Sequence, residues 1–203
     1  VFGPADAEFL YSMIRYARPK RIIEIGSGQS TLMARHAIAA NRAEEAAYSC
    51  RHVCIEPYEA GWLNELDVEL IRTPVEQIDL AVFTELEEGD ILFIDSSHMI
   101  RPQGDVLFEY LQILPVLQSG VFVHIHDIRT PKDYQQGWLS REVRFWNEQY
   151  LLYAYLSANP NALTIYGSHY HYRNNRSLLD QFMHGRFTAG GASFWFELKA
   201  PIE

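Results

Sequence analysis

Cysteine is scarce in this sequence, and basic residues are in the minority. The 203 residues include two cysteines, 17 lysines and arginines, and 26 aspartates and glutamates, which give a formal net charge of −9. Nucleic-acid binding depends on lysine and arginine side chains that neutralise phosphates, so this excess of acid argues against DNA or RNA as a partner. We therefore expect no nucleic-acid substrate and attribute the acidic surface mainly to solubility.

Long hydrophobic runs are also missing. Apolar stretches such as residues 91–94 and 121–125 have the length of a strand and are far shorter than a membrane span. We see no secretory leader, and we expect a cytoplasmic protein without a membrane partner. Cys50 and Cys54 form no CxxC pair and lack an accompanying histidine cluster, so we expect two reduced cysteines in or near the core. The sequence begins at Val1 and not at Met, as a piece of a longer protein would.

Aromatic residues, in contrast, are plentiful, at 13% of the chain, and they concentrate after residue 138. This concentration indicates either a pocket or an apolar surface that meets a partner, a second copy of the chain included. We expect Trp138 to line a pocket for the substrate, and we expect Phe145 and Tyr153 to lie in the core on a long helix. For Tyr170 and His171 we favour a solvated loop over a cap on that pocket.

Apolar and polar stretches alternate along the chain in a regular order. We expect strands at residues 21–25, 52–55, 68–71, 90–94, 120–125, 163–166 and 193–198, and helices at residues 5–17, 30–47, 58–66, 105–117 and 141–156. Strands that alternate with helices predict an α/β fold with a parallel sheet. No linker-like or repetitive stretch interrupts the order, so we expect residues 1–203 to form a single domain. A loop insertion at residues 167–191 is expected to carry a short helix near residues 177–183.

The strongest local signal is a glycine-rich turn between the first expected strand and the helix after it. Gly26 permits a sharp turn, and Gly28 allows the backbone to approach a ligand closely. A dinucleotide-binding turn would carry a third glycine where Thr31 stands, and Glu24 would repel a pyrophosphate but suit a cationic ligand. The turn therefore favours a sulfonium-bearing amino acid over a dinucleotide. Its residues are Glu24-Ile25-Gly26-Ser27-Gly28-Gln29-Ser30-Thr31.

A second signal follows the second expected strand, which ends in Cys54-Ile55-Glu56-Pro57. An acidic residue at this position is placed to accept hydrogen bonds from two ribose hydroxyls. The separation between Gly28 and Glu56 exceeds the usual ~20 residues, and a long first helix accounts for the difference. Glu56 is therefore our candidate for binding the ribose of a nucleoside cofactor.

The runs EIGSGQS and IEP, together with the order of strands and helices, resemble class I S-adenosylmethionine-dependent methyltransferases over nearly the whole chain. This resemblance implies a Rossmann-like fold, with a mostly parallel seven-stranded sheet, helices on both faces and a C-terminal antiparallel hairpin. It also implies S-adenosyl-L-methionine as the cofactor, with the methionine part at the glycine turn, the ribose at Glu56 and the adenine near Glu76 or Gln77. The implied cofactor-binding residues are Glu24, Gly26, Ser27, Gly28, Ser30, Thr31, Glu56, Glu76 and Asp95.

Titratable side chains gather where the fourth and fifth expected strands end. Asp95 and His98 follow one strand, and His126 and Asp127 follow the other. Ligands in open α/β sheets bind at the carboxyl ends of strands where the strand order reverses, so we expect these four side chains to converge on one cleft. His124 shares a strand face with His126 and is expected to be structural.

Two chemistries fit this group. In the first, a histidine acts as a general base for the acceptor hydroxyl; we favour His98, oriented by Asp95 or Asp127, with His126 as the next choice. In the second, Asp95, Asp127 and His126 bind a divalent cation such as Mg²⁺ or Mn²⁺, which lowers the pKa of that hydroxyl.

The pattern also resembles bacterial small-molecule and sugar O-methyltransferases that use Mg²⁺ with acids after the fourth and fifth strands. Those enzymes often carry a second acid or amide directly after the fifth-strand acid, where this chain has Ile128. The resemblance implies O-methylation of a small hydroxylated acceptor, a sugar or another metabolite. Two other functions stay open: a metal-dependent oxygenase or hydroxylase with a two-histidine, one-carboxylate iron site, and a non-catalytic ligand-binding domain.

Overall fold

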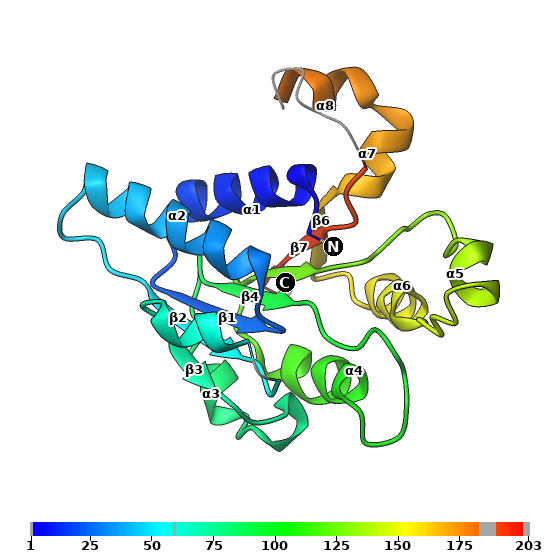
Figure 1. Ribbon diagram of the computed structural model, residues 1–203, viewed down its shortest axis with the longest axis horizontal. Helices are drawn as coiled ribbons and strands as arrows, with labels where there is room; N and C mark the ends of the chain where they lie inside the picture. The colour runs from blue at the N-terminus through cyan, green and yellow to red at the C-terminus, as the bar shows by residue number, and fades with distance from the viewer. Residues whose placement is uncertain (1, 59, 183–189, 201–203) are drawn as a thin grey trace.

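The computed structural model describes residues 2–58, 60–182 and 190–200, and within them seven strands form one sheet in the order β3-β2-β1-β4-β5-β7-β6 (Figure 1). Every pairing is parallel except the two made by β7, which runs antiparallel to both β5 and β6. The expected Rossmann-like sheet with its C-terminal antiparallel hairpin is therefore confirmed. The strands are β1 (Arg21–Ile25), β2 (Arg51–Ile55), β3 (Glu69–Ile71), β4 (Ile91–Ile94), β5 (Phe122–Ile125), β6 (Ala162–Gly167) and β7 (Phe194–Leu198).

Helices cover both faces of this sheet (Figure 1). Helices α1 and α2 pack on one face, and α3, α4 and α6 contribute to the core on the other. The helices are α1 (Pro4–Ala17), α2 (Gln29–Glu44), α3 (Ala81–Thr84), α4 (Asp105–Phe108), α5 (Gln136–Ser140), α6 (Glu148–Ala158), α7 (Ser168–Asn174) and α8 (Arg176–Phe182). Short helical turns follow at η1 (Gly61–Glu65), η2 (Val75–Gln77), η3 (Glu109–Ile113) and η4 (Leu114–Val116).

The two cores follow from the alternation of side chains along each strand. On β1, Ile22 packs into the core under α1 and α2, whereas Ile23 and Ile25 pack into the opposite core. On β7, Trp195 and Phe196 are both fully buried but belong to different cores. Because both faces are covered, the carboxyl ends of the parallel strands are left as the place where a ligand can reach the sheet.

The prediction of a long helix at residues 141–156 is wrong for its first part. The structure has α5 and then a segment without helix until α6 begins at Glu148. Asn147 explains the break, because its backbone N–H donates to His98 O and its Oδ1 accepts from the N–H of Ile100. Phe145 is 58% exposed and Tyr153 is 57% exposed, so the expectation that they lie in the core is also wrong.

The insertion after β6 is more ordered than expected. Tyr170 and His171 lie on α7 and not in a loop, and α8 occupies most of the expected short helix, whose last residue, Met183, lies outside the described residues. Cys50 and Cys54 are buried and unpaired, as expected. Among the described residues, no helix combines the length and apolar character needed to cross a membrane.

Candidate active site

A cavity of about 340 Å³ opens where β1, β2 and β4 end. Its lining includes four of the predicted site residues, Gly26, Glu56, Glu76 and Asp95. The strand order reverses between β1 and β4, which is where open α/β sheets bind their ligands. Predicted residues from four separate segments of the chain therefore line the same cavity.

Glu56 is held against the glycine turn. Its Oε2 accepts the backbone N–H of Ser27 at 3.1 Å, and its Oε1 accepts the N–H of Tyr58 at 2.9 Å. These bonds fix the carboxylate at the end of β2, where it borders the cavity.

The two glycines of the turn have different roles. Gly26 has φ +78°, and a Cβ there would lie 1.9 Å from the backbone oxygen of Asp95. Only glycine fits between β1 and β4 at this point. A Cβ on Gly28 would meet nothing within 4 Å, so open space lies beside it, as a closely approaching ligand requires.

Three residues predicted to contact the cofactor support the turn from behind. Glu24 is 1% exposed and accepts from Ser30 Oγ, from Cys54 Sγ and, at 3.0 Å, from His52 Nε2. Thr31 is fully buried, and its Oγ1 accepts the N–H of Gly28 at 3.0 Å. None of the three, Glu24, Ser30 and Thr31, lines the cavity; they hold the turn in place.

Asp95, His98 and Asp127 come together at the ends of β4 and β5. His98 Nε2 lies 3.2 Å from Asp95 Oδ1 and 3.4 Å from Asp127 Oδ2. Both His98, at φ 59°, and Asp127, at φ 55°, have left-handed backbones, which are rare in residues other than glycine and gather at functional sites. One ligand atom from each residue lies within 4.8 Å of the others, so the three can hold a metal ion.

Glu148 completes the surroundings of His98, and sequence reasoning missed it. This glutamate is fully buried at the start of α6; its Oε2 accepts from His98 Nδ1 at 2.8 Å, and its Oε1 accepts from Tyr110 Oη at 3.2 Å. Burial alone would lower the pKa of His98, but the hydrogen bonds and negative charges of Asp95 and Glu148 raise it to about 10. The sequence carried no local signal for this role, because Glu148 stands between the polar residues Asn147 and Gln149.

His126 lies beside the same carboxylates but is held from behind. Its Nδ1 is 3.5 Å from Asp95 Oδ1 and 3.6 Å from Asp127 Oδ2, and its Nε2 is 3.4 Å from Asp6 Oδ2. Burial raises the pKa of Asp6, but hydrogen bonding and charge from His126, together with Ser193, lower it overall to about 2. Nothing in the sequence pointed to Asp6, which stands 120 residues before His126.

His124 has the structural role expected of it. The side chain is fully buried, its Nε2 lies 2.8 Å from Ser193 Oγ, and its ring stacks on Phe93 at 4.0 Å. Burial lowers its pKa well below the ordinary value, so the ring is neutral.

Aromatic rings and guanidinium groups lie beside His98. Trp146 is 4.7 Å from the ring of His98, and Trp138 is 5.1 Å from Trp146. Arg129 and Arg144 place their guanidinium carbons 5.1 and 5.3 Å from the ring of Trp138. Trp138 therefore belongs to a group of rings that reaches His98 of the cluster.

Two comparisons with known proteins bear on this site. A family profile described as "Methyltransferase domain" matches residues 23–128, which include the glycine turn, Glu56 and the cluster. A curated but uncharacterised protein of Archaeoglobus fulgidus is 35% identical over 96 residues, which cover 45% of this chain and 42% of that protein. The matched segment thus spans less than half the length of this curated relative.

Solved structures share the fold at low sequence identity. The O-methyltransferase of Bacillus cereus, in complex with S-adenosylhomocysteine (SAH), has a TM-score of 0.52 at 16% identity, over 98% of this chain and 82% of that one. The O-methyltransferase TomG of Streptomyces achromogenes, in complex with S-adenosylmethionine (SAM), has a TM-score of 0.54 at 14% identity, over 98% and 82%. Cofactor-bound Rv0187 from MTB has a TM-score of 0.55 at 13% identity, over 99% and 83%. With the profile matching more than half of its length, this chain belongs to the methyltransferase domain family.

Proposed function

We propose that this protein is a SAM-dependent methyltransferase that transfers the methyl group to a hydroxyl of a small acceptor. One observation carries the proposal: Asp95 belongs both to the cavity that Glu56 and the glycine turn border and to the cluster with His98 and Asp127. A methyl donor in the cavity and a hydroxyl at the cluster would therefore be neighbours. The solved relatives that bind SAH or SAM support the choice of cofactor.

Three residues at or beside the cavity would each contact a different part of the cofactor. Glu56 would bind the ribose hydroxyls, as acids at the end of β2 do in related folds. Glu76 borders the same cavity and would contact the adenine. The space beside Gly28 would receive the methionine part.

Asp95, His98 and Asp127 fit a divalent cation. Histidine ligands of metals usually donate their second ring N–H to a carboxylate, and His98 does so to Glu148 while its Nε2 faces the two aspartates. His98 therefore replaces His126 as our nitrogen ligand. Two carboxylates with one imidazole suit Mg²⁺ or Mn²⁺. A cation bound there would lower the pKa of the acceptor hydroxyl.

The residues around the cluster prepare it for this role. His126, anchored on Asp6, would orient Asp95 and Asp127 through its Nδ1. Ile128 is 1% exposed in the core and is not a ligand. The cluster with two carboxylates and one imidazole does not favour the two-histidine, one-carboxylate iron site of the oxygenase alternative.

Calorimetric titration with SAH tests the cofactor site. The wild-type protein should bind SAH, and Glu56→Ala should weaken binding by roughly 1–3 kcal/mol, the cost of losing a charged acceptor. Glu65→Ala, at an exposed position outside the cavity, is the matched control and should bind as the wild type does. Binding of NADH without binding of SAH would overturn the proposal.

Chelation tests the cation. Treatment with EDTA should abolish methyl transfer, and added Mg²⁺ or Mn²⁺ should restore it. Asp127→Asn should weaken Mn²⁺ binding, measured by electron paramagnetic resonance, while SAH affinity stays close to that of the wild type. Transfer that is unchanged by EDTA would contradict the proposed cation.

A further inference from the structure

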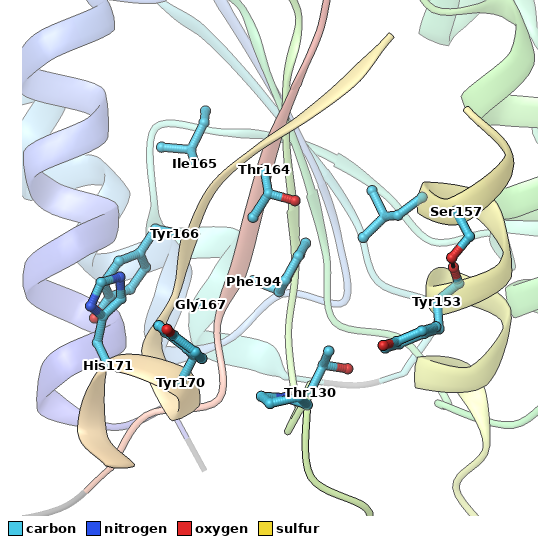
Figure 2. Close-up of a pocket in the computed structure, with 12 residues that line it drawn as sticks. Thr130, Tyr153, Ser157, Thr164, Ile165, Tyr166, Gly167, Tyr170, His171 and Phe194 are labelled. Atoms are coloured by element: carbon cyan, nitrogen blue, oxygen red, sulfur yellow. Dashed lines mark hydrogen bonds between the residues drawn. The ribbon is translucent and has the colours of Figure 1, made fainter. Parts of the chain in front are cut away.

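A second cavity, of about 510 Å³, lies between α6, the edge strand β6 and α7 (Figure 2). Helix α6 supplies Tyr153, strand β6 supplies Thr164, and α7 supplies Tyr170; Thr130, from the segment after β5, completes the ring of side chains. It shares no lining residue with the cofactor cavity. Its volume falls within the roughly 300–1,000 Å³ typical of small-molecule sites.

The lining of this second cavity carries no formal charge. It contains no aspartate, glutamate, lysine or arginine, although the chain as a whole has a net charge of −9. Burial lowers the pKa of His171, so its ring is neutral at physiological pH. The hydroxyl of Ser157 already donates to the backbone oxygen of Tyr153 at 2.8 Å. The other hydroxyl groups of the lining, on threonine and tyrosine side chains, are uncharged. Such a surface offers no counter-charge to a phosphate or a carboxylate, and its rings suit a neutral ring system.

One wall of the cavity is a stack of rings that is fixed before any ligand arrives. Phe9 of α1 stacks on Tyr166 at 3.8 Å with an interplanar angle of 7°, and Tyr166 stacks on His171 at 5.1 Å and 11°. Asn175 donates through Nδ2 to His171 Nδ1 at 3.1 Å and holds that ring in place. A wall that is already ordered loses little conformational entropy on binding.

The elements that form the cavity also hold the catalytic cluster. Helix α6 begins with Glu148, which binds His98. Helix α7 begins with Ser168, which donates to Asp6, the partner of His126. Thr130 follows Asp127 by three residues. The cavity therefore lies at the same end of the sheet as the cluster, on the side away from the cofactor cavity.

We propose that this cavity binds the neutral aromatic part of the acceptor and that the acceptor is a hydroxylated aromatic compound, not a sugar. The inference rests on the proposed function, because it assigns the substrate class of the same enzyme. An acceptor seated here would extend past Thr130 toward Asp127, where its hydroxyl would react. The exposure of Tyr153 and Tyr170, at 57% and 45%, would fall on binding.

Two tryptophan variants on β6 test the assignment. Thr164→Trp places a large ring inside the cavity, whereas Leu163→Trp places the same ring on the exposed neighbouring residue, which does not line it. The probe is 2-naphthol, a neutral two-ring alcohol, with methyl glucoside as the polar comparison. Calorimetry of the full chain measures binding of each probe and, separately, of SAH.

The wild-type protein and Leu163→Trp should bind 2-naphthol and not methyl glucoside, and Thr164→Trp should bind 2-naphthol at least tenfold more weakly. All three proteins should bind SAH alike, which shows that they are folded. Equal binding of 2-naphthol by Thr164→Trp, or a preference for methyl glucoside, would overturn the inference. A wild-type dimer that Thr164→Trp converts to a monomer would also overturn it, because the cavity would then be an interface. Binding of 2-naphthol without binding of SAH by any variant would instead contradict the proposed function and leave the cavity's ligand class standing.

Discussion

Glu148 and Glu109 are two fully buried glutamates on the same side of the sheet, and they should respond to the same substitution in opposite ways. Glu148 is paired with His98 at 2.8 Å. Glu109 has no cationic partner within ion-pairing distance among the described residues, and its carboxyl group accepts a hydrogen bond from Ser96 Oγ at 3.1 Å. Burial, followed by the charges of Glu148 and Asp105, raises the pKa of Glu109 well above the ordinary value. Glu148 therefore faces a cationic partner, whereas Glu109 faces none and has a raised pKa.

Glu148→Gln should destabilise the metal-free protein by about 3–5 kcal/mol, because it removes the carboxylate that partners Nδ1 of the buried His98 imidazolium and leaves only the two aspartates at Nε2. The pKa of His98 gives a similar bound: a rise from 6.5 to about 10 corresponds to roughly 5 kcal/mol at about 1.4 kcal/mol per pH unit. Because the folded-state pKa lies above the unfolded one, this stabilisation is fully present below pH 6.5 and is lost as the pH rises toward 10. The variant should lose much of that pH dependence.

Urea unfolding of EDTA-treated protein at pH 6 and pH 9 measures both effects. Glu109→Gln is the matched control; its amide has nearly the same shape as the carboxyl group and replaces a buried acid that has no cationic partner, so stability at neutral pH should stay the same or rise. Equal losses in the two variants would refute the distinction between Glu148, which is paired with His98, and Glu109, which has no cationic partner. A wild-type stability that does not fall between pH 6 and pH 9 would refute the pairing with His98.

Other substitutions probe the turn and the sheet. Gly26→Ala should cost about 3 kcal/mol or more of stability in urea unfolding, since its Cβ would overlap Asp95. Gly28→Ala should leave stability unchanged but weaken SAH binding roughly tenfold, about 1.4 kcal/mol, by calorimetry. His124→Ala should cost about 2–4 kcal/mol and leave SAH affinity intact. Because burial lowers the pKa of His124, the free energy of unfolding of the wild type should fall as the pH drops below about 6.5. This fall should be smaller in His124→Ala. An equal fall in the two proteins would contradict the neutral ring.

The sheet could be predicted because its signals are local. The apolar run at β4 and the mostly apolar runs at β1 and β5 identify strands covered on both faces, and the glycine turn fixes the strand–turn–helix order at Gly26. The end of β4 places Asp95 and the end of β5 places Asp127, so their meeting follows from parallel topology alone. The helix expected at residues 141–156 failed because a tertiary contact, Asn147 with His98, overrides the periodicity.

The parts of the site that escaped prediction depend on contacts between distant segments. Asp6 reaches His126 across 120 residues, and Glu148 reaches His98 across 50. Glu24 was predicted to contact the cofactor, but its carboxylate is buried against His52 and Cys54 of the adjacent strand. Side-chain direction at a strand end follows from the packing of both faces, which no single segment contains.

A crystal structure grown with SAH and Mn²⁺ tests the central claim most directly. The account predicts SAH in the cavity with its ribose on Glu56, and an anomalous Mn²⁺ peak bound by Asp95, His98 and Asp127. SAH bound elsewhere, or a Mn²⁺ peak away from these three residues, would contradict it.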